Sequence, residues 1–142
     1  MIIREARPKD AGQIYDLYHD VMQYDFPVEQ MEKMIEIVSQ DKNNYVFVAV
    51  EDEMIQGVIE VVIKYSIHKG SYLIINTLAV ASDVQRKGVG TKLLAYVEAF
   101  AKEHQLGSIN VGSQVKRINA HHFYQKNGFD LIKEHKIFEK KL

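Results

Sequence analysis

LAVASDVQRKGVGT, residues 78–91, is the stretch that decides the fold of this 142-residue chain. An apolar strand ends within it, a short loop turns, and an amphipathic helix begins. The loop carries Gly88 and Gly90, and two adjacent cations, Arg86 and Lys87, precede them. A glycine turn that leads into a helix presents free backbone N–H groups where the helix dipole is positive. The sequence therefore predicts a phosphate or pyrophosphate site here, which side chains in place of the two glycines would obstruct.

Two common phosphate-binding patterns do not fit this loop. The dinucleotide fingerprint Gly-x-Gly-x-x-Gly needs a third glycine where this chain has Leu93. The P-loop places its lysine directly after a glycine, whereas Lys87 comes before Gly88. The pattern that remains is Gln-x-x-Gly-x-Gly, which runs from Gln85 to Gly90.

The composition is that of a globular protein without thiol chemistry. Apolar residues make up 46% of the chain, charged residues 26%, and the formal net charge is −1. These values predict a single domain over residues 1–142 with a sizeable core. A net charge near zero argues against bulk nucleic-acid binding, which usually needs a basic face. Because the chain has no cysteine, disulfides, thiolate metal sites and a cysteine nucleophile are excluded.

Neither a membrane span nor a secretory signal is predicted. No apolar run approaches the roughly 18 residues that a span requires. The first residues, MIIRE, already include an acidic residue, and no long apolar segment follows them. A signal peptide has the opposite pattern. We therefore expect a cytoplasmic protein with no membrane partner.

Hydrophobic periodicity predicts ten helices and strands along the chain. Strands are expected at residues 2–6, 45–50, 55–67, 72–80, 109–115 and 129–140, and helices at 8–21, 28–39, 88–104 and 119–126. The order β-α-α-β-β-β-α-β-α-β predicts a mixed α/β or α+β sandwich.

A second motif lies in residues 113–129, SQVKRINAHHFYQKNGF. Its informative positions are Ala120, Phe123, Tyr124, Gly128 and Phe129. By themselves Phe123 and Phe129 are typical of a core, and Gly128 is typical of a left-handed helix end.

The two motifs together resemble the GNAT superfamily of N-acetyltransferases, as a small single-domain member. The pattern from Gln85 to Gly90 is similar to the superfamily's acetyl-CoA pyrophosphate loop, and residues 113–129 are similar to its C-terminal signature. The predicted element order is also the GNAT order. The resemblance implies a mixed α/β fold with a mostly antiparallel, twisted sheet flanked by helices. It also implies acetyl-CoA as co-substrate, no metal, and transfer of an acetyl group to an amine by direct attack, with which the lack of cysteine agrees.

Site residues follow from the resemblance, position by position. Tyr124 would be catalytic and would give a proton to the departing thiolate. The residues implied in acetyl-CoA binding are Leu78, Ala79, Val80, Gln85, Arg86, Lys87, Gly88, Val89, Gly90, Thr91 and Asn119. Backbone groups of the strand would pair with the pantetheine arm, and amides of the loop would hold the pyrophosphate.

The general base and the acceptor are left open by the sequence. Many members of the superfamily carry a glutamate at the position of Asn76, and an asparagine cannot take up a proton at neutral pH. Glu60, a histidine or a chain of waters could serve instead, and none of them is assigned. His121 and His122 could contact a ligand or have structural roles. The aromatic-acidic break YDF, residues 24–26, could bind a cationic amine or simply pack as a turn between two helices.

Three functional alternatives fit these observations. The first is an acetyl-CoA-dependent N-acetyltransferase for a primary amine of a small molecule or a protein. The second is a non-catalytic acetyl-CoA-binding sensor or partner-binding module with the same fold, which the asparagine at position 76 favours. The third is a phosphate-binding domain for another nucleotide, which requires both motif matches to be accidental. In the first alternative the partners are acetyl-CoA and the amine, without nucleic acid, and a homodimer is possible.

Overall fold

The computed structural model describes residues 1–85 and 87–142. It forms two compact units, Met1–Gly112 and Ser113–Leu142. The expectation that residues 1–142 make a single domain stays a prediction. Among the described residues, no helix is long and apolar enough to cross a membrane.

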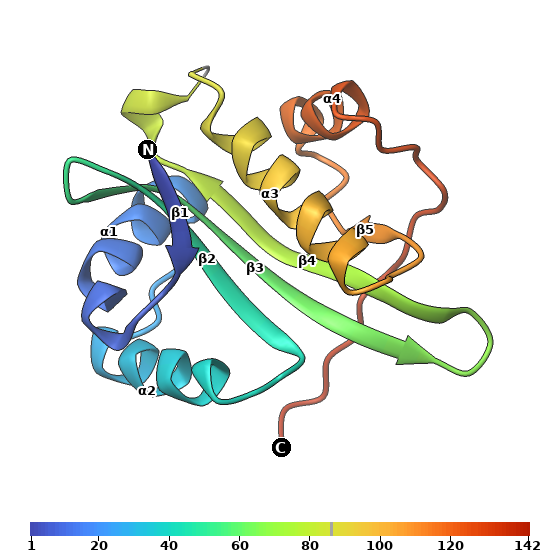
Figure 1. The fold of residues 1–142 in the computed structure, drawn as a ribbon, viewed down its shortest axis with the longest axis horizontal. Helices are drawn as coiled ribbons and strands as arrows, with labels where there is room; N and C mark the ends of the chain where they lie inside the picture. The colour runs from blue at the N-terminus through green and yellow to red at the C-terminus, as the bar shows by residue number, and fades with distance from the viewer. Residues whose placement is uncertain (86) are drawn as a thin grey trace. The chain divides into compact units, whose positions relative to one another are not determined.

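The first unit is built on a five-stranded sheet in the order β1-β2-β3-β4-β5 (Figure 1). The strands are β1 (Ile2–Glu5), β2 (Asn44–Glu51), β3 (Met54–Ser66), β4 (Gly70–Val80) and β5 (Ile109–Val111). The first four strands pair antiparallel with their neighbours, and β5 pairs parallel with β4. The predicted mixed, mostly antiparallel sheet is therefore confirmed, although β5 ends earlier than the expected 109–115.

Helices cover both faces of this sheet (Figure 1). A short 3-10 turn (Pro8–Asp10) leads into α1 (Ala11–Met22), which is followed by α2 (Val28–Ser39). These two helices share one buried cluster with residues of β2, β3 and β4 such as Val48, Val58 and Ala79. The helix α3 (Val89–Glu103) packs against the other face, where Phe47 of β2 meets Tyr96 and Phe100 of α3 edge to face. Alternation of side chains along β2 sends Phe47 and Val48 to opposite faces.

Gly57 allows α3 to lie close to the sheet. A Cβ atom built on Gly57 would stand 2.9 Å from Leu93 Cδ1, 3.0 Å from Val89 Cγ1 and 3.3 Å from the Ala79 carbonyl oxygen. Both contacted side chains belong to the first turns of α3. The absence of a side chain at position 57 therefore sets where that helix begins relative to β3 and β4.

Gly57→Val is expected to destabilise the fold by about 1–3 kcal/mol, because the added methyl groups overpack a filled interface. Urea unfolding of the parent and the variant measures this difference. Gly12→Ala is the matched control, since Gly12 is exposed in α1 and a Cβ there meets nothing within 4 Å. The control should be neutral or more stable by up to about 1 kcal/mol. Equal stability of Gly57→Val and the parent would contradict the close packing.

An ion pair fastens β1 to the start of α1. The Arg4 guanidinium donates to both oxygens of Asp10, at 2.8 and 3.0 Å, and the Arg7 backbone N–H donates to the same carboxylate at 2.7 Å. Asp10 is buried. The hydrogen bond from Arg4 lowers the pKa of Asp10 below its ordinary value, against the opposing effect of burial.

Asp10→Asn should lower the free energy of unfolding by about 1.5–3 kcal/mol at neutral pH, the usual worth of charged hydrogen bonds. The folded-state pKa of Asp10 lies below its unfolded value, so its contribution is present above about pH 4 and is lost as the pH falls further. The difference in free energy of unfolding between parent and variant should therefore become smaller in acid. Urea titrations at neutral and acidic pH measure it. The control Asp52→Asn changes an exposed residue and should unfold with the same free energy as the parent. A difference between the parent and Asp10→Asn that grows in acid would contradict the ion pair of Asp10.

The second unit contains the helix α4 (Ile118–Lys126). Gly128 follows it with a φ of 89°, the left-handed conformation that glycine favours. The Phe129 N–H then donates to the Tyr124 carbonyl at 3.0 Å, which closes the helix end as the sequence predicted.

The predicted final strand at 129–140 is wrong. Residues 129–142 carry neither a helix nor a strand, and their apolar side chains Leu131, Ile132, Ile137 and Phe138 are exposed. The β-branched and aromatic composition favoured a strand. A strand also needs a neighbouring backbone to pair with, and composition says nothing about that neighbour.

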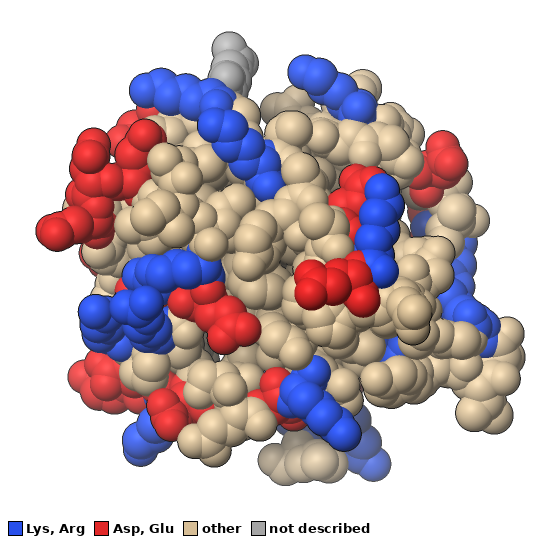
Figure 2. Space-filling model, viewed as in Figure 1, with Lys and Arg blue, Asp and Glu red and all other residues tan. Residues whose placement is uncertain are grey.

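Surface charge is mixed on the face that Figure 2 presents, where acidic and basic side chains alternate over the surface. This distribution agrees with the formal net charge of −1.

Candidate active site

Strand β4 loses its parallel neighbour half-way along its length. The pairing with β5 consists of Leu73 with Ile109, Ile74 with Asn110 and Ile75 with Val111. Residues 77–80 continue β4 and stay paired with β3 on the other side. Within the described part of Met1–Gly112, no strand pairs with residues 76–80 on the β5 side, so this part of β4 has an open edge.

The open edge begins at a β-bulge. Thr77 lies opposite Glu60 of β3, and Ile75 lies opposite the next residue, Val61, so Asn76 is an extra residue in β4. Asn76 is exposed. A bulge bends its strand and increases the local twist, and here it coincides with the position where β5 ends its pairing.

A glycine turn connects the open edge to α3. After the short 3-10 helix Ser82–Val84, Gly88 adopts a φ of 82° and caps the helix that begins at Val89. The Gly88 carbonyl accepts the first helical bond from the Lys92 N–H at 3.0 Å. The backbone N–H groups at positions 89–91 have no acceptor within the helix, because the first turn of any α-helix lacks one.

The side chain of Gln85 ties this loop back to the strand. Its Nε2 donates to the Val80 carbonyl oxygen at 3.1 Å. The sequence predicted Gln85 in acetyl-CoA binding but gave no sign of this contact. Its consequence is that the loop entering α3 keeps a fixed relation to the end of β4.

The other loop residues can be placed individually. Leu78 and Val80 are half-buried on β4, and the side chain of Ala79 is buried at 1% exposure, so Ala79 can reach a ligand only through its backbone. Lys87 and Thr91 are exposed, whereas Val89 and Gly90 are buried. The prediction for Arg86 lies outside the described residues.

Tyr124 and Asn119 belong to α4 in the second unit. Tyr124 is half-buried, and burial raises the pKa of its phenol, while the nearby Arg117 lowers it by less. Its ring packs edge to face on Phe123 and Phe129. Within residues 113–142 no group hydrogen-bonds the Tyr124 hydroxyl, which leaves it able to donate a proton. Asn119 is exposed near the start of α4.

The two histidines of α4 differ in their surroundings. His121 Nε2 lies 2.8 Å from the Gln114 carbonyl oxygen, so that nitrogen serves as a donor that braces the chain before the helix. His122 is exposed. The contact of His121 favours a structural role for it.

A buried tyrosine of α1 holds the carboxylate of Glu60. The Tyr18 hydroxyl donates to Glu60 Oε2 at 2.5 Å, and Tyr18 itself is only 6% exposed. Burial, followed by the charge and hydrogen bond of Glu60, raises the pKa of Tyr18 well above its usual value. Tyr24 stands edge to face against Tyr18, with ring centroids 5.5 Å apart.

Asp25 of the same break is already engaged. Its Oδ1 accepts a hydrogen bond from the Tyr15 hydroxyl at 2.7 Å, which raises the pKa of Tyr15. Phe26 is 45% exposed. Tyr24 and Asp25 therefore each contact a tyrosine of α1, in addition to forming the connection between α1 and α2.

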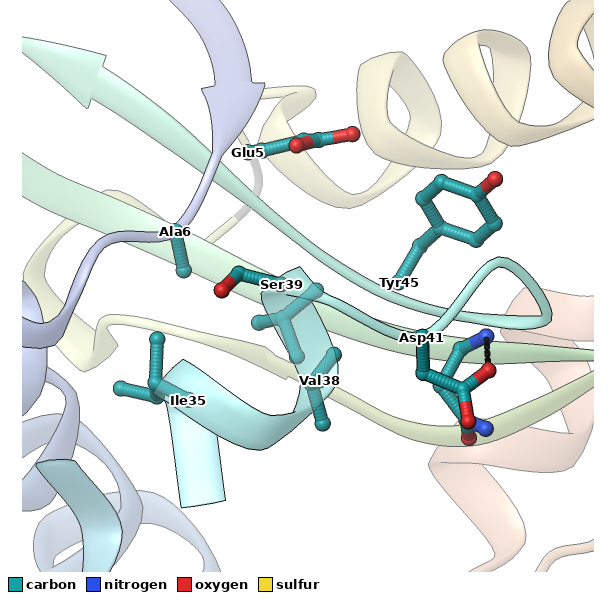
Figure 3. A pocket seen from close by; sticks show the side chains of 9 residues that line it. Glu5, Ala6, Ile35, Val38, Ser39, Asp41 and Tyr45 are labelled. Carbon is teal, nitrogen blue, oxygen red and sulfur yellow. Dashed lines mark hydrogen bonds between the residues drawn. The ribbon is translucent and has the colours of Figure 1, made fainter. Parts of the chain in front are cut away.

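The described part of the first unit contains hollows of different sizes, among them a small and a larger one. The smaller, of about 20 Å³, sits between α2 and β2 and is lined by residues such as Ile35, Val38 and Tyr45 (Figure 3). It has room for about one water. The larger, of about 290 Å³, lies between α1 and the loop after β4 and is lined by acids that include Asp16, Asp20 and Asp83. No cluster of three or more His, Cys, Asp or Glu side chains suited to a metal is present among the described residues.

Comparison with known sequences settles the family. The sequence model of the acetyltransferase (GNAT) family matches residues 11–129. The chain belongs to this family. It is therefore an acetyltransferase, and the predicted resemblance is confirmed.

Two relatives named N-acetyltransferases and one solved structure are similar to this chain. The Bacillus subtilis protein described as uncharacterized N-acetyltransferase YhdJ is 30% identical over 105 residues, which make up 73% of this chain and 74% of that protein. The aminoalkylphosphonate N-acetyltransferase of Salmonella typhimurium is 22% identical over 128 residues, 89% of this chain and 83% of that protein. The solved structure of a transcriptional regulator from Bacillus halodurans has a TM-score of 0.89 at 25% identity, covering 98% of this chain and 99% of that one.

Local sequence patterns do not reveal several features of this acetyltransferase. Tyr18 fits the apolar face of a helix, and Gly57 lies within a β-branched strand, so neither residue stands out in the sequence. Glu60, an acid within the apolar strand VIEVVI at residues 58–63, stands out in the sequence as a candidate base, but its contact with Tyr18 does not. Nothing in the sequence pointed to the pairing of Gln85 with Val80.

Proposed function

We propose that this enzyme transfers the acetyl group of acetyl-CoA to a primary amine by direct attack. The observation that carries the proposal is the open edge of β4, which leads through a glycine turn into the N-terminus of α3. An open strand edge offers backbone donors and acceptors to an extended amide chain such as pantetheine. A helix N-terminus offers N–H groups to a pyrophosphate.

Each predicted residue has a stated part in this proposal. The backbone at Leu78, Ala79 and Val80 pairs with the pantetheine arm, although the Val80 carbonyl is already shared with Gln85. The amides of residues 85–91 hold the pyrophosphate, with the charge of Lys87 beside them. The resemblance to the family supports a role for Asn119 in binding the coenzyme and for Tyr124 as proton donor.

The reaction can be balanced with these groups. The unprotonated amine nitrogen attacks the thioester carbonyl carbon, a new C–N bond forms, and the C–S bond breaks. Tyr124 gives its proton to the departing thiolate and regains one, through solvent, from the nitrogen that has become an amide. A backbone N–H on the open edge polarises the carbonyl oxygen as negative charge develops. No acyl intermediate on a cysteine can form, because the chain has no cysteine.

An amine acceptor is supported by a relative. The Salmonella typhimurium protein is described as an aminoalkylphosphonate N-acetyltransferase, and its acceptor therefore carries an amine. The cytoplasmic location, the lack of nucleic-acid and membrane partners, the independence from metals and a homodimeric assembly remain predictions.

A non-catalytic module is the second candidate. Asn76 stands where a general base would be expected, and the similar Bacillus halodurans structure is described as a transcriptional regulator. Release of free thiol from acetyl-CoA across a panel of primary amines separates the two candidates. Thiol release that depends on an amine supports the enzyme, and binding of acetyl-CoA without thiol release supports the module.

Acetyl-CoA is expected to stabilise the protein. At about 100 times its Kd, a ligand that binds only the folded state adds about 2.7 kcal/mol, which for a chain of this length raises the melting temperature by roughly 5–11 °C. Thermal unfolding with acetyl-CoA, with ATP and with NAD measures the effect. An equal shift with ATP would contradict the assignment of the loop to coenzyme A.

A further inference from the structure

We propose that the carboxylate of Glu60 binds the ammonium group of the acceptor, so that the acceptor is a small primary amine that enters as a cation and gives one proton to water before its nitrogen attacks. This inference rests on the proposed function for its chemistry and concerns a residue on β3 rather than β4. Tyr18 is the positioning residue for Glu60, and Tyr24 forms an aromatic wall next to Tyr18.

The carboxylate is unusually placed for a glutamate. Glu60 is half-buried on β3, two residues after Val58, whose side chain is fully buried. Within Met1–Gly112, residue 86 apart, no Lys, Arg or His lies within 4.0 Å of its oxygens. Within this unit the half-buried carboxylate therefore has no cationic side chain beside it, and a cationic ligand could pair with it through charge-assisted hydrogen bonds.

The hydrogen bond from Tyr18 fixes the orientation of the Glu60 carboxylate. The 2.5 Å contact uses Oε2 of Glu60, and the buried Tyr18 ring cannot move without disturbing α1. Oε1 has no hydrogen-bond partner among the described residues of the first unit. One oxygen is therefore held by the fold, and the other is left to accept from a ligand.

The register of the sheet brings this carboxylate to the open edge of β4. Glu60 faces Thr77, and directly opposite residues in an antiparallel pair have Cβ atoms about 4.5–5.5 Å apart. Thr77 is the residue that follows the bulge at Asn76, where β4 loses β5. An ammonium bound at Glu60 is thus one strand away from the edge that we assign to acetyl-CoA.

Tyr24 gives the site an aromatic component. Its ring is 42% exposed and stands edge to face on Tyr18, so one of its surfaces is available to a ligand. A cation within about 6 Å of an aromatic face is attracted by the ring. Tyr24 therefore adds an exposed aromatic ring next to Tyr18, the residue that holds the Glu60 carboxylate.

A purely structural role would make Glu60 the acceptor that satisfies the buried Tyr18 hydroxyl. Glu60→Gln separates the two roles, because an amide oxygen still accepts from Tyr18 while the charge is removed. Glu32→Gln is the matched control, with the same loss of charge on the exposed surface of α2. Melting temperatures of all variants report whether the fold survives.

The experiment measures binding of amines directly, with free coenzyme A present so that no transfer takes place. The probes are butylamine, 2-phenylethylamine, 1,4-diaminobutane and the dipeptide Gly-Gly, each compared with an uncharged analogue in which a hydroxyl or an acetamide replaces the amine. Calorimetry gives the Kd for the parent, Glu60→Gln, Glu32→Gln and Tyr18→Phe. Thiol release from acetyl-CoA with the same amines is measured separately.

We expect at least one amine to bind the parent more tightly than its uncharged analogue. Glu60→Gln should weaken that binding by about 10- to 150-fold, the range for a charged hydrogen bond, and Glu32→Gln should leave it unchanged. Tyr18→Phe should raise the KM for the amine by about threefold to tenfold with nearly constant kcat, since it frees the carboxylate without removing it. If Glu60→Gln does not fold, Tyr18→Phe carries the test by itself, and an unchanged KM and Kd in that variant overturns the proposal.

The outcomes distinguish this inference from the proposed reaction. Binding that depends on Glu60 without thiol release supports the site and contradicts the transfer reaction. Thiol release that Glu60→Gln leaves unchanged supports the reaction and overturns the site. A fall in kcat with unchanged amine affinity also overturns it, because Glu60 would then act in proton transfer. The ammonium site is also overturned if the uncharged analogues bind as tightly as the amines, or if no amine binds.

Discussion

Tyr124→Phe is expected to lower kcat by about 10²–10⁴-fold, the usual worth of general acid catalysis, while the Kd of acetyl-CoA stays nearly constant. The ring is retained, so its packing on Phe123 and Phe129 is preserved. Only the hydroxyl is lost, which is the group that we propose as proton donor to the thiolate. Steady-state thiol release with an acceptor from the amine panel, together with calorimetry for acetyl-CoA, makes the comparison.

The protonation state of Tyr124 is compatible with a proton donor. Burial raises its pKa above the ordinary value of about 10, so the phenol stays protonated through neutral pH and carries a proton to donate. Tyr65→Phe is the matched control, since Tyr65 is 69% exposed on β3. A kcat for Tyr124→Phe within about threefold of the parent would remove Tyr124 as the acid and favour a water-mediated proton or a rate limited by product release.

Local patterns predicted most of the helices and strands. The helix Val28–Ser39 was predicted at its observed bounds, because Pro27 marks its start and apolar residues recur on one face. The left-handed glycines 88 and 128 were foreseen as turn and helix-end residues, and the two motifs around them led to the confirmed family. These features depend on residues that are close together in the sequence.

Features that depend on distant partners were not predictable in the same way. The strand expected at 129–140 did not form, and β5 stopped at Val111, because strand pairing is decided by the neighbouring backbone. The contact of Tyr18 with Glu60 joins residues 42 positions apart, and the close approach at Gly57 involves a helix more than 30 residues later. Packing of this kind is decided by the whole fold and leaves little trace in a short window of sequence.

Thr91→Glu should weaken acetyl-CoA binding by about tenfold or more while the free protein keeps its stability. Thr91 is exposed at the third position of α3, where we place the pyrophosphate. Two unit charges about 4 Å apart near a protein surface interact by up to about 4 kcal/mol, so an added carboxylate repels the anion strongly. An acid in the first turn of a helix is itself favourable, which is why the fold should tolerate the change.

Gln30→Glu provides the control for this prediction, because Gln30 is exposed at the third position of α2 and receives the same charge in the same helical setting. Its Kd for acetyl-CoA, measured by calorimetry, should equal that of the parent, and both variants should melt at or slightly above the parent temperature. High salt should reduce the difference between the two variants, since exposed charges are screened over about 8–10 Å. If Thr91→Glu binds acetyl-CoA as tightly as Gln30→Glu does, the N-terminus of α3 does not hold the pyrophosphate, and the assignment of residues 85–91 is wrong.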